Sequence, residues 1–274
     1  MPCIHLTSVD DPRLQRYCNL KLARTTSWQP QFVVEGEKLV VRLLECGLAV
    51  QSFLLMEKTV ERMLPLLPPD VPAYVLPNEL MAQLVGFDFH RGVMACVPRP
   101  AERELGMWLL HPSKPTTGLV CAEVKDPQNL GSILRIASGF GASWVLLGPN
   151  CCDPWNRRVL RVSMGESFRL PIMISQNLQN DLRRLRDEFS IELAATVLDP
   201  TAEPLVAAGR SHHFALVLGS EGYGLSADIV QLCSRRLTIP MQLGTDSLNV
   251  AVAAGIFLYH FTQCVPIAPP SRTN

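Results

Sequence analysis

The sequence predicts an α/β protein in which short apolar strands of a parallel sheet alternate with helices. Residues 214–218 form an apolar run closed by Gly-Ser-Glu-Gly, and residues 237–239 form a shorter one, as expected of buried parallel strands that end in loops. Residues 250–258 are apolar or small, which predicts a buried helix with Ser247 or Asn249 near its start. Because ligands bind at the carboxyl ends of such strands, we expect these loops to form one pocket.

The composition is that of a globular protein without global charge. The chain has 274 residues, of which 47% are hydrophobic and 18% are charged, and its formal net charge is zero. The length favours one or two domains, and any site for a polyanion has to be a local basic patch. No apolar run approaches the roughly 20 residues of a membrane span, and residues 1–10 lack the pattern of a secretory signal.

The cysteines argue against both a zinc site and a disulfide framework. There are nine of them, an odd number, with no Cys-x-x-Cys spacing and with Cys151 and Cys152 adjacent. This usage favours a reducing compartment, so we expect a cytoplasmic protein. The sequence shows no cluster of histidine, cysteine and carboxylate residues that suits a metal ion. We therefore expect no metal site.

Residues 1–97 predict an N-terminal helix followed by a small α/β domain. Asp11 and Pro12 supply a cap and a first-turn proline for the helix. Its basic face is interpreted as solvated, with an arm that touches nucleic acid as the alternative. Strands are expected at residues 32–36, 52–56, 73–76 and 92–97, and helices at 37–46 and 79–85. Glu35 and His90 stand isolated, and a structural role is favoured for both.

Residues 98–117 are proline-rich and are expected to link this domain to a second one, at 118–274. Strands are expected there at residues 118–124, 142–147 and 191–197, in addition to the two named above. After the first of them, an Asp-Pro pair forces a turn, and Asn129 is the expected helix cap. Arg135 projects off the apolar stripe of that helix, near the carboxyl end of the strand. For these two residues a plain cap and a surface ion pair remain the alternatives.

A basic cluster follows, in which Arg157, Arg158 and Arg161 lie within five residues. Guanidinium groups suit bidentate contacts with phosphate, so this is the candidate patch for a polyanion. A second motif, Gly-Tyr-Gly-Leu-Ser-Ala at 222–227, imitates a dinucleotide fingerprint. It stands late in its domain, and the acidic residue that it needs, Asp246, lies inside a loop, so we discount it.

Four blocks of the second domain resemble the SpoU-type (TrmH-like) RNA ribose 2′-O-methyltransferases of the SPOUT superfamily. They occur in the order of the family, at residues 126–141, 156–172, 216–226 and 239–254. The first domain is similar to the family's ribosomal-protein-like RNA-binding domain through Phe-Val-Val-Glu-Gly-Glu and His-Arg-Gly-Val-Met-Ala. Ser220 stands where many members carry asparagine, and Gln128 replaces a common glycine, which leaves the subfamily open.

The resemblance implies a C-terminal trefoil knot, a homodimer and S-adenosyl-L-methionine as cofactor. Backbone groups at Gly219, Ile239 and Leu248 would contact this cofactor. The reaction implied is methyl transfer to a ribose 2′ oxygen of RNA, with no metal and no membrane involved. Ribosomal RNA is favoured over transfer RNA because of the extra N-terminal domain. Transfer RNA as substrate and a non-catalytic RNA-binding scaffold are the alternatives.

The resemblance assigns the catalytic role to Arg135, surrounded by Asn129, Glu221, Ser247 and Asn249. Arginine is a poor general base because its pKa exceeds about 12, so Arg135 is expected to clamp a substrate phosphate or to be organised by one. In a non-catalytic RNA-binding scaffold, at least one of these residues would be expected to be replaced, and the sequence retains all of them. RNA binding is expected at the basic cluster, which consists of Arg157, Arg158 and Arg161.

Overall fold

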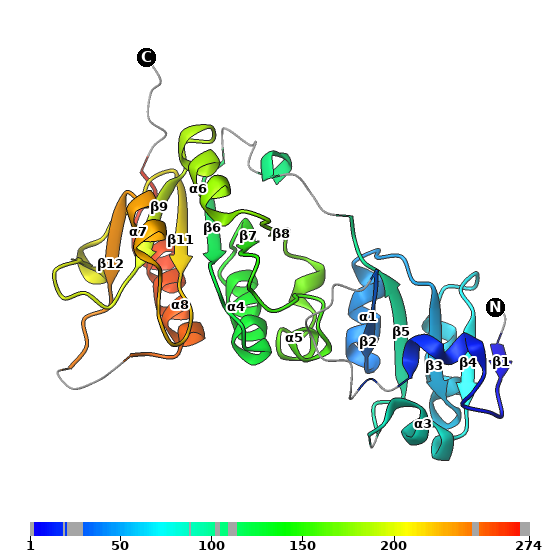
Figure 1. Cartoon of the computed structure of the whole chain (residues 1–274). Helices are drawn as coiled ribbons and strands as arrows, with labels where there is room; N and C mark the ends of the chain where they lie inside the picture. The colour runs from blue at the N-terminus through cyan, green and yellow to red at the C-terminus, as the bar shows by residue number, and fades with distance from the viewer. Residues whose placement is uncertain are drawn as a thin grey trace. The chain divides into compact units, whose positions relative to one another are not determined.

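The computed structural model describes residues 3–18, 20, 30–87, 89–101, 105–108, 114–242 and 247–268. The chain divides into two compact units (Figure 1). Unit 1 consists of Met1–Ala101 with Asp153–Phe168, and unit 2 of Glu102–Cys152 with Arg169–Asn274. The α/β class predicted from the sequence is confirmed in both.

Unit 1 is built on a five-stranded sheet with the order β1-β4-β3-β5-β2, in which β5 runs antiparallel to β2 and β3. Its strands are β1 (Cys3–His5), β2 (Gln31–Glu35), β3 (Ser52–Met56), β4 (Ala73–Leu76) and β5 (Val93–Pro98). Its α-helices are α1 (Glu37–Glu45), α2 (Val60–Met63), α3 (Asn78–Val85) and α5 (Arg157–Val162). The expected N-terminal helix is a 3-10 helix, Pro12–Tyr17, which Asp11 caps as predicted. Leu22, which the expected helix would reach, lies outside the described residues.

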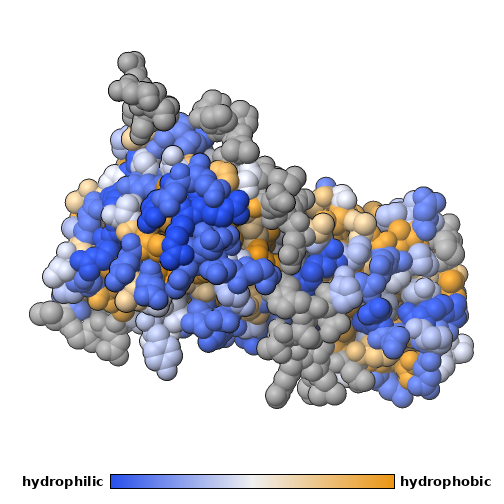
Figure 2. Space-filling model, turned by 45° about the horizontal axis from the view of Figure 1, so that its top comes forward, coloured by the Kyte–Doolittle hydropathy of each residue, from blue (hydrophilic) through white to orange (hydrophobic). Residues whose placement is uncertain are grey.

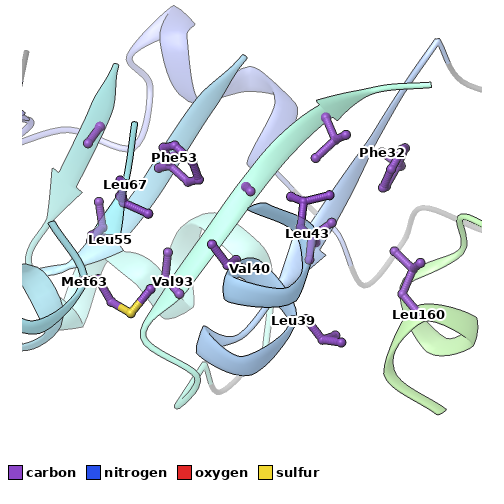
Figure 3. Packing of buried hydrophobic residues seen from close by; sticks show 14 of the residues in the cluster. Phe32, Leu39, Val40, Leu43, Phe53, Leu55, Met63, Leu67, Val93 and Leu160 are labelled. Carbon is purple, nitrogen blue, oxygen red and sulfur yellow. The ribbon is translucent and has the colours of Figure 1, made fainter. Parts of the chain in front are cut away.

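The segment Asp153–Phe168 packs into unit 1, although the sequence analysis assigned it to the second domain. Figure 3 shows Leu160 of α5 beside the cluster formed by β2, α1 and β3. Trp155 stacks between Phe32, at 5.0 Å between ring centroids, and Phe168, at 6.4 Å. Arg99 and Asp153 form a bidentate ion pair with contacts of 3.0 and 2.6 Å. Apolar packing therefore outweighs sequence continuity in setting this boundary.

Unit 2 is built on a seven-stranded sheet with the order β10-β12-β9-β11-β6-β7-β8, in which every pair is parallel. Its strands are β6 (Thr116–Cys121), β7 (Trp144–Leu147), β8 (Ile172–Ile174), β9 (Glu192–Thr196), β10 (Glu203–Pro204), β11 (His213–Leu218) and β12 (Arg235–Thr238). Its α-helices are α4 (Pro127–Gly139), α6 (Leu178–Asp187), α7 (Ala227–Leu232) and α8 (Val250–Tyr259). The predicted buried parallel strands are thus confirmed.

Helices cover both faces of this sheet. α6 and α7 pack on the face that carries Val120, Leu146 and Val217. The alternate residues of β11 face the other way, where the ring of Phe214 lies 4.5 Å from that of Phe261, just after α8. On the first face the indole of Trp144 lies over Gly118, where a Cβ atom would come within 2.0 Å of the ring. Glycine is therefore required at that point of β6.

The expected linker, residues 98–117, contributes in part to unit 2, because Leu105 is buried in its core. Within the described part of the chain, no helix is long and apolar enough to cross a membrane. Figure 2 shows one face of the molecule, where hydrophilic residues are interspersed with separate hydrophobic patches. The described residues also contain no group of three or more histidine, cysteine, aspartate or glutamate side chains arranged for a metal ion.

Candidate active site

A cleft of about 510 Å³ opens in unit 2 at the carboxyl ends of β9, β11 and β12. The three residues predicted to contact the cofactor, Gly219, Ile239 and Leu248, all line it. Glu221 and Ser247 line it as well. The remaining lining residues are mainly apolar or glycine: Thr196, Val197, Leu198, Leu218, Ser220, Gly222, Tyr223, Gly224, Leu225, Met241, Val250, Ala253 and Phe257. The expectation that these loops converge on one pocket is confirmed.

One wall of the cleft is a tight turn that follows β11. Ser220 and Gly224 exchange backbone hydrogen bonds of 2.9 and 3.1 Å, and the Ser220 hydroxyl accepts a further one from the Tyr223 amide at 3.1 Å. Gly224 has φ +68°, in the left-handed region that favours glycine. A Cβ atom on Gly219 would lie 2.2 Å from the backbone of Gly224, so only glycine lets the two segments approach. The turn therefore holds Glu221 in a defined place.

The start of α4 differs from the prediction in a way that matters for the site. The helix is capped by Asp126, whose carboxylate accepts from the amides of Gln128, at 2.6 Å, and Asn129, at 3.1 Å. Pro127 occupies the first helical position, where its fixed φ suits a helix start. The expectation that Asn129 is the cap was wrong. Because the cap lies three residues earlier, the Asn129 side chain is available for tertiary contacts.

Three predicted site residues are joined by hydrogen bonds. The Asn129 amide nitrogen donates to Glu221 Oε1 at 3.1 Å, and the Asn249 amide nitrogen donates to Asn129 Oδ1 at 2.9 Å. The backbone amide of Asp126 also points at Glu221 Oε1, at 3.4 Å. The chain Asn249–Asn129–Glu221 thus connects residues 120 and 92 positions apart in sequence.

Parallel packing of two helices brings these residues together. Asn249 caps α8, because its Oδ1 accepts from the amides of Ala251 and Val252 at 2.9 and 3.3 Å. The rings of Phe140 and Tyr259 meet at the far ends of α4 and α8, 5.9 Å apart. The starts of the two helices therefore lie side by side, as Figure 1 shows. Their N-terminal dipoles favour a carboxylate at this position, which Glu221 provides.

Arg135 is placed differently from the other predicted catalytic residues. It lies on the exposed side of α4, six residues and about 9 Å along the axis from Asn129. Within the described part of the chain it makes no hydrogen bond or ion pair with another residue. Ser247 lines the cleft, together with Glu221. The structure thus joins Asn129, Glu221 and Asn249, places Ser247 nearby, and leaves Arg135 exposed and unpaired.

The predicted RNA-binding arginines belong to unit 1, where Arg157 and Arg161 lie beside Glu35. Arg157 forms an ion pair with Glu35 through Nη2 and contacts the same oxygen through Nε at 3.2 Å. Arg161 lies 4.0 Å from that oxygen, whereas Arg91 contacts the other oxygen at 3.1 Å. Glu35 is therefore not isolated, and the sequence analysis missed this cluster because 122 residues separate its two halves.

The comparisons with known proteins agree on one family. The model of the SpoU rRNA Methylase family matches residues 117–259. A protein named as an uncharacterized tRNA/rRNA methyltransferase of Mycobacterium bovis is 34% identical over 93% of this chain and 90% of its own. The 23S rRNA (guanosine(2553)-2′-O)-methyltransferase of Bacillus subtilis is 30% identical, over 84% of this chain and 87% of its own.

Solved structures share the fold over nearly the whole chain. The crystal structure of an AdoMet-bound rRNA methyltransferase from Sinorhizobium meliloti superposes with a TM-score of 0.79. It covers 94% of this chain and 97% of its own, at 24% sequence identity. At that identity the likeness establishes the fold alone.

Proposed function

The chain belongs to the SpoU rRNA Methylase family, and we propose that its cleft carries out methyl transfer from S-adenosyl-L-methionine to a ribose 2′-hydroxyl of ribosomal RNA. The protein is an RNA 2′-O-ribose methyltransferase, as its curated relatives are. The observation that carries the assignment of the site is the hydrogen-bonded chain Asn249–Asn129–Glu221, which ends at Glu221 in the lining of the cleft. Transfer RNA remains the alternative substrate.

The cleft fits the cofactor in size and in chemistry. Its volume, about 510 Å³, lies within the range of small-molecule sites, and apolar side chains dominate its lining. We propose that the backbone around Gly219, Ile239 and Leu248 contacts the adenine and amino-acid parts. The position of all three residues in the lining of the cleft supports this. When bound, S-adenosyl-L-methionine supplies a methyl group on a positively charged sulfonium.

The residues of this chain have to align the ribose hydroxyl and assist the loss of its proton. Alignment alone contributes about 7–11 kcal/mol in well-oriented reactions. We propose that Asn129, Asn249 and Ser247 hold the nucleotide or the surrounding loops through neutral hydrogen bonds. Glu221 already accepts from Asn129 and from the start of α4, so we assign it the role of fixing these elements.

We assign Arg135 to the substrate phosphate. Its guanidinium is exposed and has no protein partner within the described residues, which suits a group that pairs with an incoming anion. A guanidinium with a pKa above about 12 does not accept the proton of the hydroxyl. Arg135 therefore acts by clamping a phosphate next to the reacting ribose.

RNA binding is proposed for unit 1, in keeping with its expected ribosomal-protein-like character. Arg158 and Arg161 remain proposed RNA contacts, and their position on one short helix supports this, whereas the ion pair of Arg157 with Glu35 gives that arginine a supporting role. We also propose a cytoplasmic location, supported by nine free cysteines, the pattern of a reducing compartment.

A homodimer is proposed from the surface of α8. This helix is apolar all round, yet Val252, Ile256 and Tyr259 are 51%, 38% and 54% exposed. These residues are spaced four and three apart, so they form one stripe along the helix. A helix that is apolar on every side is normally buried, and a second copy would cover this stripe. In sedimentation measurements we expect the wild type to be a dimer and the Ile256→Glu variant to be a monomer.

The trefoil knot is also a proposal. α8 follows β12, near one edge of the sheet, but packs against α4, which follows β6. The end of β12 and the start of α8 therefore lie over different strands of the sheet, so the chain returns toward β6 before α8 begins. A return of this kind is what a knotted C-terminus requires.

The proposed function is tested by methyl transfer to ribosomal RNA. Purified protein with radiolabelled S-adenosyl-L-methionine should label unmodified ribosomal RNA, and cleavage resistance should place the methyl on a 2′ oxygen. Transfer RNA serves as the competing substrate in the same assay. Binding of the cofactor without any transfer to either RNA would favour the scaffold alternative.

A further inference from the structure

Three arginines of unit 1 share a single buried carboxylate. The side chain of Glu35, at the end of β2, is 2% exposed. Arg91 contacts its Oε1 at 3.1 Å, while Arg157 pairs with Oε2 and Arg161 lies 4.0 Å from that same oxygen. One negative charge thus faces three positive charges. We call this set of four residues the Glu35 cluster.

Arg157 is committed to the protein in a way that the other two arginines are not. Besides Glu35, it donates through Nη1 to the carbonyl of Leu20 at 3.0 Å, and its guanidinium lies over the ring of Phe87 at 4.7 Å. Its side chain is 20% exposed. It therefore serves to hold Glu35, and with it the geometry of the cluster.

Arg91 and Arg161 keep donors that no other described residue uses. Their side chains are 52% and 37% exposed, and Glu35 is the one partner that either has among the described residues. At 4.0 Å, Arg161 is too far from the carboxylate for a good hydrogen bond. Each guanidinium offers five N–H donors, so most of these donors remain for a ligand.

Among the described residues, Glu35 is the one carboxylate that pairs with these three arginines, so positive charge is in excess there. Burial lowers the pKa of Arg161, and the neighbouring guanidiniums of Arg91, Arg157 and Arg158 lower it further, against the opposite effect of Glu35. Like charges held this close disfavour one another unless an anion lies among them. If the cluster served only as a structural ion pair, one arginine would be enough to neutralise Glu35.

We propose that Arg91 and Arg161, held in place by Glu35 and Arg157, form a binding site for a backbone phosphate of the substrate RNA. The inference rests on the proposed function, because the anion is taken to be part of that RNA. Two partly exposed guanidiniums on the two oxygens of one carboxylate supply the charge and the donors that a phosphodiester requires. Such a contact positions the RNA without reading its sequence.

The test is the salt dependence of RNA binding by the full-length double variant Arg91→Gln/Arg161→Gln. With a fluorescently labelled ribosomal RNA hairpin as the probe, the slope of log K against log salt should fall by about two. The affinity for S-adenosyl-L-methionine, measured by calorimetry, should not change. An unchanged slope would overturn the proposal. A wild-type protein that binds the hairpin but transfers no methyl to any RNA would instead count against the proposed function.

Two further variants distinguish a phosphate site with defined geometry from general electrostatic attraction to RNA. Arg62→Gln removes an exposed arginine of the same unit, paired with Glu37, and should leave the slope unchanged. An equal loss there would show that any arginine suffices. Glu35→Gln raises the net charge, so general attraction predicts tighter binding, whereas loss of orientation predicts binding at least several-fold weaker. Tighter binding by this variant would overturn the positioning role of Glu35.

Discussion

The two units each organise polar side chains around one glutamate, and they do so in opposite ways. Glu35 of unit 1 is 2% exposed and is surrounded by the guanidiniums of Arg91, Arg157 and Arg161. Glu221 of unit 2 is exposed and accepts from the neutral amides of Asp126 and Asn129. The first arrangement gathers positive charge around its carboxylate, whereas the second gives its carboxylate neutral hydrogen-bond donors.

This difference matches the two tasks that the proposed function requires. A polyanion is held by charge, and its affinity then depends on salt. A sugar hydroxyl beside a sulfonium needs orientation, which neutral hydrogen bonds supply without adding a competing charge. The contrast therefore separates residues whose loss should affect stability or RNA binding from residues whose loss should affect turnover.

The largest effect is expected at Arg135, which, unlike Arg157, has no carboxylate partner among the described residues. Arg135→Ala should reduce methyl transfer by about 10³-fold, within the range for a charged group that positions the substrate beside the reacting atoms. Unfolding temperature and cofactor affinity should stay at the wild-type values, because the side chain is exposed. Single-turnover transfer to ribosomal RNA measures this effect. Wild-type turnover in this variant would remove Arg135 from the mechanism.

Glu35→Gln should produce the largest loss of stability. Removing one member of a buried charge network costs about 3 kcal/mol, because the remaining arginines are left without a counter-charge. Urea unfolding at neutral pH measures the difference. Arg62→Gln, at an exposed ion pair in the same unit, is the control and should change the unfolding free energy by less than about 1 kcal/mol. Equal losses in the two variants would contradict the contrast between buried and exposed pairs.

Glu221→Gln should reverse that pattern. Its carboxylate is exposed, so the free energy of unfolding should change by less than about 1 kcal/mol. Methyl transfer should fall by about 10–100-fold, because Asn129 and Asp126 both donate to Glu221 Oε1, and the neutral oxygen of a glutamine amide accepts these bonds more weakly than a carboxylate oxygen does. The comparison with Glu35→Gln is direct, since both changes are isosteric. A variant that unfolds easily but retains its turnover would break the comparison.

The smallest of these effects is expected at Asn249. Asn249→Ala removes the cap of α8 and should cost about 1 kcal/mol of stability. Asn249→Ser retains a capping oxygen but cannot donate an amide hydrogen to Asn129 across the same distance. The serine variant should therefore regain most of the stability while its turnover stays low. Recovery of both properties together would mean that Asn249 serves only as a cap.

The fold could be predicted largely from local patterns. Buried runs such as β11 are apolar throughout, because helices cover both faces of the parallel sheet, and such runs are visible in the sequence. β1 was not predicted. It has three residues and pairs with one neighbouring strand, so it is too short to show an alternation of apolar and polar residues. The cap of α4 was misplaced because Asp126 and Asn129 are both good capping residues. The proline between them decides in favour of Asp126.

The sequence allowed prediction of those site residues that lie at the carboxyl ends of strands. Gly219 and Ile239 follow the ends of β11 and β12, so their meeting in one cleft follows from the parallel order. The link between Asn129 and Asn249 depends on parallel packing of α4 and α8, and no local pattern encodes this. The pairing of Glu35 with Arg157 spans 122 residues and became visible only in the structure.

Unit 1 is discontinuous, and this has a consequence for how the protein is made. Its core includes Leu160 and Phe168, which a ribosome adds long after Ala101. Until then, the nascent N-terminal part exposes the apolar surface that these residues later cover. Glu35 also cannot pair with Arg157 before that residue has been synthesised. The N-terminal unit therefore completes itself only when part of the second unit has already been synthesised. Translation pauses before residue 168 would prolong the exposure of a half-finished core.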